Sequence, residues 1–233
     1  MAKKNTGKKR VIRQNRWCIC TEGKTEAIYL DAYCRELGVR HLIDINAEHT
    51  ECKMKRGEAC GRQHLPLISQ MKSCHYIRKY ACIIAIHDYD KHHDPKKGNA
   101  THVTFDDASQ VGKDVDIHVF YTIPSFEYWL LLHHEFEQSD LTRAACLKKV
   151  FEYTNRKRKE CGKPPLRKKE DVKTDPDLFS YFGGLDGVQK AMKWAEMLLP
   201  SGQLPLKPSS IKPSTNMHVL MEKIQDFAAS QFT

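Results

Sequence analysis

The sequence predicts an α/β fold in which a mostly parallel sheet is flanked by helices and followed by a helical C-terminal extension. Short apolar runs with strand character occur at residues 16–21, 81–87 and 115–122. Segments with helical spacing of apolar residues separate these runs, and such alternation is typical of parallel sheets. After residue 124 the strand-like runs give way to amphipathic helical patterns.

The first half of the chain alternates strands and helices. The strand at 16–21 is followed by a helix at 25–37, which Gly38 closes in the usual C-terminal position. Thr21 or Thr25 is expected to cap this helix. The remaining elements of this half are a strand at 41–47, a helix at 62–79, a strand at 81–87, a helix at 101–113 and a strand at 115–122.

The second half is predicted to be helical and to pack on the sheet. Ser125 is expected to cap its first helix, and a basic, proline-containing stretch at 155–173 and a loop at 200–213 interrupt the pattern. Further helices are expected at 141–153, 186–199 and 216–229. The predicted organisation is a disordered basic arm at 1–15, an α/β core at 16–123 and a helical part at 124–233.

The composition is typical of a soluble globular protein, with 233 residues, 40% hydrophobic and 29% charged. No apolar run is long enough to cross a bilayer, and no apolar signal segment follows the basic N-terminus. We therefore expect a cytoplasmic protein without a membrane partner. Its nine scattered cysteines are expected to be reduced.

The formal net charge is +9, and two basic blocks at residues 3–16 and 156–169 carry much of the excess. A basic excess favours polyanions, chiefly nucleic acid, through phosphate contacts. For the first block alone we prefer a solvated or disordered tail. The candidates for nucleic-acid contacts in the second block are Arg156, Lys157, Arg158, Arg167, Lys168 and Lys169.

Acidic side chains follow two of the predicted strands. Glu22 follows the first strand, and Asp88 and Asp90 follow the third. Because functional groups gather at the carboxyl ends of neighbouring strands in an open α/β sheet, we expect these three carboxylates to meet. Such a cluster needs positive charge, and Mg²⁺ or Mn²⁺ with oxygen ligands supplies it. The alternative is that Asp88 and Asp90 are ordinary turn residues.

Three further residues lie near this pattern. Glu26, one turn into the first helix, either faces the carboxylates or caps backbone amides. Lys24 either meets a phosphate or is a solvated surface lysine. Glu127 lies among apolar residues and needs a partner. We prefer the metal site for Glu127 over a buried pair with Arg143 or His133.

A second metal-like pattern occurs in a loop rich in glycine and lysine. Two cysteines and two histidines there have the residue types of a tetrahedral zinc site, namely His49, Cys52, Cys60 and His64. The order of these residues is unusual for zinc, so we prefer unligated loop residues.

Several of these stretches resemble known families. Glu22-Gly-Lys-Thr-Glu26 followed by Asp88-Tyr-Asp90 resembles the Toprim domain of topoisomerases, primases and overcoming-lysogenization-defect nucleases. Pro124-Ser-Phe-Glu-Tyr-Trp-Leu-Leu-Leu-His133 and Lys212-Pro-Ser-Thr-Asn-Met-His218 resemble signatures of the RloB family. The matches follow one another in the family's order and cover nearly the whole chain.

The resemblance implies a Toprim-like fold and a role in bacterial antiviral defence. Such proteins occur beside restriction-modification genes or with an ABC-type ATPase partner in abortive infection. It also implies that Glu22, Asp88 and Asp90 hold magnesium, with Glu22 as ligand or general base. The stretch Ser214-Thr-Asn216 and His218 would face the site and contact a phosphate at a helix N-terminus.

The leading hypothesis is a metal-dependent nuclease, a hydrolase that cleaves DNA or RNA, including tRNA. Its catalytic candidates are Glu22, Glu26, Asp88, Asp90 and Glu127. The competing hypothesis is a non-catalytic binding or regulatory module that docks onto the ATPase. A third is a transferase or phosphatase acting on a small phosphorylated molecule. A homo-oligomer stays open.

Overall fold

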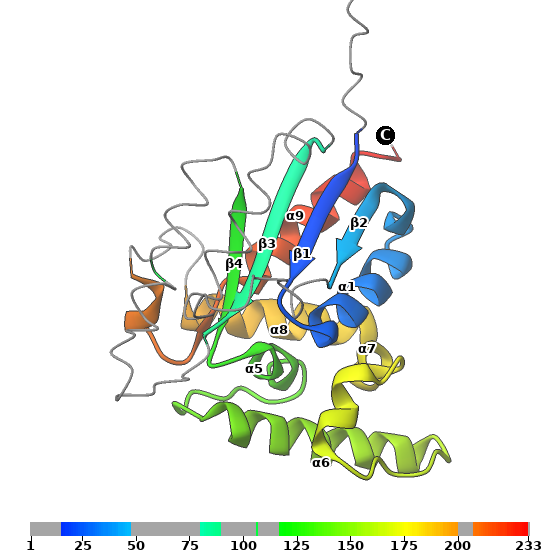
Figure 1. The fold of residues 1–233 in the computed structure, drawn as a ribbon, viewed down its shortest axis with the longest axis vertical. Coiled ribbons are helices and arrows are strands. Elements are labelled where there is room, and N and C mark those ends of the chain that lie inside the picture. Colours follow the sequence, from blue (N-terminus) through cyan, green and yellow to red (C-terminus); the bar gives the residue numbers. More distant parts are fainter. Residues whose placement is uncertain (1–14, 48–79, 90–105, 107–116, 200–206, 233) are drawn as a thin grey trace, which may run out of the picture.

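The computed structural model describes residues 15–47, 80–89, 106, 117–199 and 207–232 (Figure 1). Several predictions lie outside these residues. They are the basic arm except for Asn15, the helix at 62–79, most of the helix at 101–113, Asp90, and the possible zinc residues His49, Cys52, Cys60 and His64. Within the described part of the chain, every helix is too short or too polar to cross a membrane.

A five-stranded sheet forms the centre of the fold, with the strand order β2-β1-β3-β4-β5. The strands are β1 Trp17–Thr21, β2 Ile43–Asn46, β3 Cys82–Asp88, β4 His118–Ile123 and β5 Ser214–Thr215. The first four are parallel, and β5 is antiparallel to β4. The predicted mostly parallel α/β sheet is therefore confirmed. Strand β1 lies between β2 and β3. The chain therefore adds β2 on one side of β1 and then continues with β3 on the other side, so the strand order reverses between β1 and β3.

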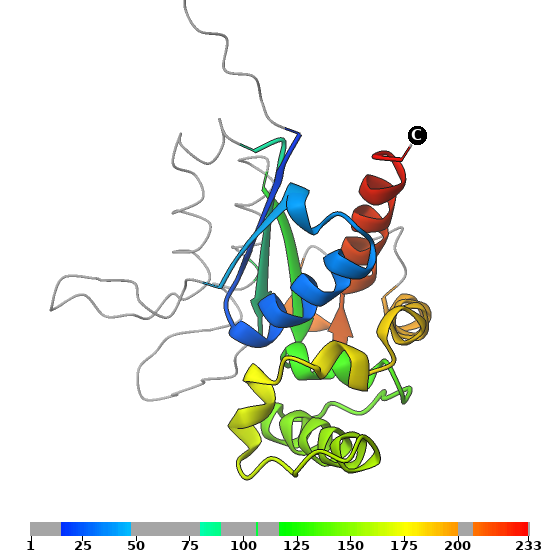
Figure 2. The same cartoon turned by 90° about the vertical axis from the view of Figure 1, so that its right-hand side faces the viewer.

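Helices cover the sheet and extend beyond the carboxyl ends of its strands. The α-helices are α1 Lys24–Glu36, α5 Phe126–Leu131, α6 Arg143–Glu160, α7 Leu178–Tyr181, α8 Gly184–Leu198 and α9 Met217–Ala229. Short 3-10 helices are η1 Arg40–Leu42, η3 Lys169–Thr174 and η4 Pro208–Ser210. Helices α1 and α9 lie on one side of the sheet, whereas α5 and α6 lie beyond the strand ends (Figure 2).

The core follows the two-residue period of the strands. Ile19 of β1 faces the layer of α1 and α9, whereas its neighbours Cys18 and Cys20 pack in a separate cluster with Ile83. Trp17 stacks on Phe227 of α9 with ring centroids 4.2 Å apart. Both faces of β1 are therefore buried, as expected for a central strand of a parallel sheet.

The start of α1 differs from the prediction, whereas α5 starts at the predicted residue with a different side-chain bond. Neither Thr21 nor Thr25 caps α1: Gly23 is the N-cap residue, and the Thr21 hydroxyl donates to the Gly23 carbonyl at 2.7 Å. Ser125 occupies the N-cap position of α5, but its hydroxyl donates to Glu127 Oε2 at 2.6 Å instead of bonding the backbone. At α5 the Glu127 carboxylate thus takes the hydroxyl that would otherwise cap the helix, whereas at α1 the Thr21 hydroxyl bonds a backbone carbonyl.

Helix α6 is longer than the predicted 141–153, because it runs through the first part of the basic stretch. Lysine, arginine and glutamate are good helix formers, so the charge of this stretch does not interrupt the helix. The helix ends near Gly162, whose φ of 70° is the left-handed conformation common after helix C-termini.

The C-terminal segment before α9 completes the sheet. Thr215 Oγ1 donates to the Tyr121 carbonyl at 2.9 Å, and Asn216 Oδ1 accepts from the Tyr121 amide at 2.6 Å. Ser214 Oγ donates to the Ile211 carbonyl at 2.8 Å. The resemblance implied that these side chains contact phosphate, but in the structure they bond backbone groups of β4 and of the segment just before β5.

Candidate functional site

Strand order brings Glu22 and Asp88 together. Glu22 directly follows β1 and Asp88 is the last residue of β3, and the two strands are adjacent and parallel with Thr21 opposite Ile86. The Asp88 amide donates to Glu22 Oε2 at 3.1 Å. Both carboxylates therefore lie at the point where the strand order reverses, which is where ligands bind in open α/β sheets.

The turn between β1 and α1 places a third carboxylate at this point. Glu26 is the third residue of α1 and is 3% exposed. Its carboxylate folds back over Gly23, where an added Cβ would lie 2.4 Å from Glu26 Oε2. A side chain at position 23 would therefore displace the Glu26 carboxylate, which the positive end of the helix dipole favours in its present place. The Glu26 carboxylate thus lies over the first turn of α1 and also near the other acids.

Glu127 supplies the fourth carboxylate from α5, which begins just beyond β4. It is 2% exposed, and its Oε1 lies 3.7 Å from Lys173 Nζ. His133, one of the alternative partners, instead bonds Tyr29 and Phe182. The negative charge of Glu127 raises the pKa of both Glu26 and Asp88. Glu127 therefore lies in the acidic group and pairs with Lys173, and its assignment to a metal site stays a prediction.

Two of the four acids, Glu26 and Asp88, have raised pKa values. Burial is the main cause that raises the pKa of Glu26 to about 7, with the charges of Glu127 and Glu22 adding to it. Burial also raises the pKa of Asp88 well above its usual range, followed by the charges of Glu26, Glu127 and Glu22. Without a bound cation, the cluster therefore retains protons near neutral pH.

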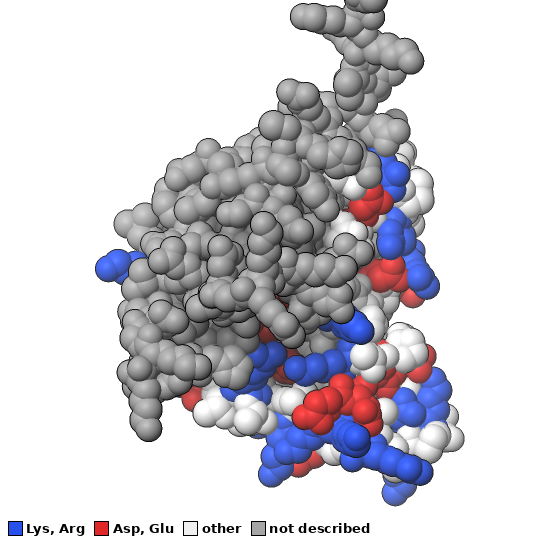
Figure 3. Space-filling model, viewed as in Figure 1, with Lys and Arg blue, Asp and Glu red and all other residues white. Residues whose placement is uncertain are grey.

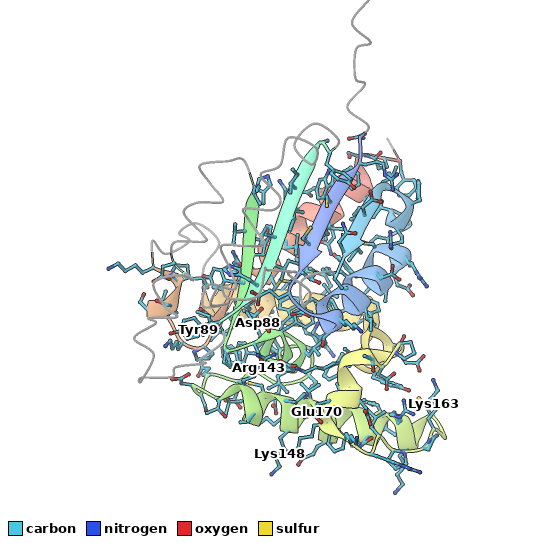
Figure 4. The ribbon with its side chains drawn as sticks, in the orientation of Figure 1. Asp88, Tyr89, Arg143, Lys148, Lys163 and Glu170 are labelled. Carbon is cyan, nitrogen blue, oxygen red and sulfur yellow. The ribbon has the colours of Figure 1, made fainter. Side chains whose placement is uncertain are left out.

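Two cations among the described residues oppose these acids. Lys173 lowers the pKa of Glu26, and Arg143, the first residue of α6, lowers the pKa of Asp88. Figure 4 shows Asp88 at the end of β3 and Arg143 on α6 beyond it. Both effects are smaller than the burial and carboxylate effects that raise the pKa values. The site therefore has room for further positive charge.

The residues present fit a hard divalent cation in type and charge. Asp88 Oδ1 is buried and has no hydrogen-bond partner among the described residues. Carboxylate oxygens are the ligands that Mg²⁺ and Mn²⁺ prefer. As the side chains stand, no three His, Cys, Asp or Glu residues of the described chain converge tightly enough to hold an ion. Asp90, the third predicted ligand, lies outside the described residues.

Some of the candidate residues for nucleic-acid contacts are exposed, whereas others bond to groups of the protein itself. Arg167, Lys168 and Lys169 are exposed before and at the start of η3, and Lys24 is exposed at the start of α1. Arg158 is instead committed to the fold, because it donates to the Asp175 carboxylate at 2.7 Å and to a backbone carbonyl at 2.8 Å.

The other two candidates are on the outer part of α6. Arg156 lies over the Tyr153 ring, 4.9 Å from its centroid, and Lys157 pairs with Glu160 at 2.7 Å. Figure 3 shows lysine and arginine side chains along the edge formed by α6, interleaved with acidic residues. This edge is therefore a mixed surface with a basic component.

Sequence reasoning missed the role of Lys173 and treated Arg143 only as a possible partner of Glu127. Lys173 ended a basic stretch, and no local pattern there points to a carboxylate on another helix. Only the packing of η3 against the rest of the molecule brings it to Glu127.

These features define an α/β protein with an acidic site at the carboxyl edge of a mostly parallel sheet. The family model described as RloB-like protein matches residues 17–224, so the chain belongs to the RloB-like family. No curated protein and no solved structure matches the chain.

Proposed function

We propose that this protein is a metal-dependent nuclease that hydrolyses phosphodiester bonds in DNA or RNA. The observation that carries the proposal is Asp88 Oδ1, a buried carboxylate oxygen that has no hydrogen-bond partner among the described residues. It lies in a group of acids whose charges raise the pKa of Asp88. Buried polar groups normally have hydrogen-bond partners, so an exception at a strand edge supports ligand binding. The adjacent cations support a ligand that also carries negative charge.

In this proposal Glu22 and Asp88 hold Mg²⁺ or Mn²⁺, together with Asp90 and the neighbouring Glu127. When bound, such an ion stabilises charge on a phosphate and lowers the pKa of a coordinated water. The backbone amide of Asp88 fixes the orientation of Glu22. Glu26, with a pKa of about 7, is suited to accept or deliver a proton near neutral pH.

The basic residues of α6 and η3 hold the nucleic-acid backbone in the same proposal. Phosphate contacts carry no sequence information, which fits either DNA or RNA, including tRNA, as the substrate. A role in bacterial antiviral defence with an ATPase partner extends the proposal and is supported by the family resemblance alone.

Calorimetric titration with Mg²⁺ and Mn²⁺ tests the metal site. We expect the wild type to bind and Asp88→Asn, which keeps the side-chain shape but removes the charge, to lose binding by about tenfold or more. Asp186→Asn, at an exposed position of α8, is the matched control and should bind like wild type. Wild type that binds neither ion, with or without an oligonucleotide, would contradict the proposal.

Cleavage assays with the same three proteins test the chemistry. Labelled tRNA, single-stranded DNA and duplex DNA are incubated with Mg²⁺ or Mn²⁺, with and without the ATPase from the same defence locus. Wild type and Asp186→Asn should cleave at least one substrate, whereas Asp88→Asn should not. Equal cleavage by Asp88→Asn would remove Asp88 from the mechanism and sink the metal-site assignment.

A further inference from the structure

The acidic site and the basic stretch meet at one side chain, Lys173. Its ammonium group lies 3.7 Å from Glu127 Oε1, and its charge also lowers the pKa of Glu26. The Lys173 side chain is 32% exposed, whereas that of Glu127 is 3% exposed. Lys173 therefore connects the buried carboxylates to the solvent-facing surface.

The fold holds Lys173 firmly in this position. It belongs to η3, whose neighbouring residue Val172 is fully buried in the main core. The buried carboxylate of Asp175 follows directly and pairs with Arg158 of α6 at 2.7 Å, with 0% exposure of the Asp175 side chain. Lys173 is thus placed by packing and a buried ion pair, unlike a lysine on a solvated surface.

The contact between Lys173 and Glu127 leaves capacity for another partner. A lysine ammonium has three donors, and 3.7 Å is longer than a normal N–H···O hydrogen bond. A partly exposed ammonium beside a site that suits a metal is well placed to receive a phosphate oxygen. The exposed residues Arg167, Lys168 and Lys169 lie directly upstream of η3 or at its start, and Glu170 and Asp171 separate them from Lys173 in the sequence.

We propose that Lys173 contacts a phosphate oxygen of the nucleic-acid strand at the acidic site, and that the strand continues over residues 167–169. The class of ligand in this inference rests on the proposed function. Lys173, at the end of the basic stretch, then binds the phosphate at the acidic site, and the exposed residues 167–169 bind neighbouring phosphates of the same strand.

A purely structural role for Lys173 has different consequences. If Lys173 only neutralises Glu127, its loss leaves Glu127 with an uncompensated charge and changes stability and metal binding, with no specific effect on nucleic acid. If Lys173 contacts phosphate, its loss removes one phosphate contact. Affinity for Mg²⁺ then stays equal or rises, because a positive charge near the acids is gone.

The test compares nucleic-acid binding by wild type, Lys173→Met, Lys169→Met and Lys190→Met. Lys169 lies at the exposed start of η3 on the proposed path, whereas Lys190, an exposed lysine of α8 outside that path, is the matched control. Binding of a labelled single-stranded oligonucleotide is followed by fluorescence anisotropy with Ca²⁺ in place of Mg²⁺, over a range of salt concentrations. Lys173→Arg, which restores the charge, completes the set, and calorimetry gives the Mg²⁺ affinity of each protein.

We expect Lys173→Met to weaken binding by about tenfold and to reduce the salt slope by about 0.7, the value for one lost contact to a single strand. Lys169→Met should weaken binding by less than about threefold, since an exposed lysine contributes little alone. Lys190→Met should bind like wild type, since the proposed strand path does not reach α8. Lys173→Arg should recover most of the affinity, and Mg²⁺ binding by Lys173→Met should not weaken.

Oligonucleotide affinity and salt slope of Lys173→Met equal to those of wild type would overturn the inference. So would weaker Mg²⁺ binding in this variant, or failure of both Lys173→Met and Lys173→Gln to fold, since each result indicates a structural lysine. The assay requires no cleavage. A wild type that binds the oligonucleotide through Lys173 but never cleaves would therefore sink the nuclease proposal while the phosphate contact stands.

Discussion

Two groups of buried polar side chains lie between α1 and α5, and they are satisfied to very different degrees. His133, at the end of α5, pairs through Nε2 with the Tyr29 hydroxyl at 3.0 Å and through Nδ1 with the Phe182 carbonyl at 2.9 Å. The carboxylates of Glu26 and Glu127 lie on the same two helices, but their group leaves Asp88 Oδ1 without a described partner.

The His133 group is a structural clamp in which both ring nitrogens of His133 have partners. A carbonyl only accepts, so Nδ1 carries the proton and Nε2 accepts from Tyr29. Burial lowers the pKa of His133 to about 3, so the ring is neutral. The rings of Tyr29, Trp129 and Phe182 pack edge-on against it. Burial of a polar group therefore does not by itself mark a functional site.

The clamp and the acidic group are linked through their helices. Tyr29 lies one turn after Glu26 on α1, and His133 follows Glu127 at the end of α5. The satisfied group thus fixes the two helices that carry the unsatisfied one. Changes in the clamp should mainly cost stability, and changes in the acidic group should mainly cost binding.

The largest expected effect is at Gly187, where the backbone of α8 approaches the clamp. A Cβ there would lie 1.9 Å from the Phe182 carbonyl oxygen and 2.7 Å from His133 Nδ1. Gly187→Ala should lower the free energy of unfolding by about 3 kcal/mol or more, because the backbone and the clamp cannot both keep their positions. Urea unfolding followed by circular dichroism measures the change.

Gly162→Ala is the matched control for this substitution. Gly162 has a φ of 70° but open space around its Cβ position, so only the backbone cost of about 1 kcal/mol applies. Equal losses in the two variants would show that the contact with the clamp is not what constrains Gly187.

An intermediate effect is expected from pH. The pKa of His133 falls from about 6.5 in the unfolded chain to about 3 in the folded protein. The unfolded state therefore binds more protons below pH 6.5, and the stability from neutral His133 is present above that pH and lost as pH falls toward 3. By pH 5 the loss is about 2 kcal/mol.

The comparison of wild type with His133→Gln isolates this contribution from other titrating groups. The wild type should be more stable than the variant at about pH 7.5, and the difference should shrink by about 2 kcal/mol at about pH 5. Denaturant unfolding at several pH values measures it. A difference that stays constant across this range would show that His133 is not buried in the neutral form.

The smallest expected change in stability is at Asp88, and it has the opposite sign. Asp88→Asn in metal-free buffer should raise the free energy of unfolding by about 1 kcal/mol, because it removes a buried carboxylate that the site compensates poorly. The folded-state pKa of Asp88 is raised, so its contribution to stability is lost as pH rises. The gain should therefore be larger at about pH 8 than at about pH 5.

Thermal melting with a chelator and then with excess Mg²⁺ measures the stability of each protein without and with the ion. Mg²⁺ should stabilise the wild type by mass action and leave Asp88→Asn unchanged. If Asp88→Asn is less stable than wild type without metal, Asp88 belongs with the structural clamp and not with the acidic site.

Local patterns in the sequence were enough to predict the sheet and the first two site residues. The apolar runs, their alternation with helical segments, and the acids directly after β1 and β3 are all readable within short windows. A general rule for parallel sheets then places Glu22 and Asp88 together, although they are 66 residues apart in the chain.

Other features have no local signal. Strand β5 is two residues long, too short to show a period, and it forms only because β4 offers an edge. The continuation of α6 into the basic stretch was hidden by its charge. The cap residue of α1 is Gly23 and neither of the predicted threonines, and Ser125 at the N-cap position of α5 bonds the Glu127 carboxylate in place of the backbone.

The sequence by itself thus determined the fold class and the chemistry of the acidic edge, because strand and helix periods and strand ends are local properties. Only the tertiary structure decided which buried polar groups are satisfied. His133 meets Tyr29 and Phe182, and Lys173 meets Glu127, through the packing of helices that are distant in the chain. Whether a buried charge is compensated depends on what packs around it, and that is a property of the whole fold.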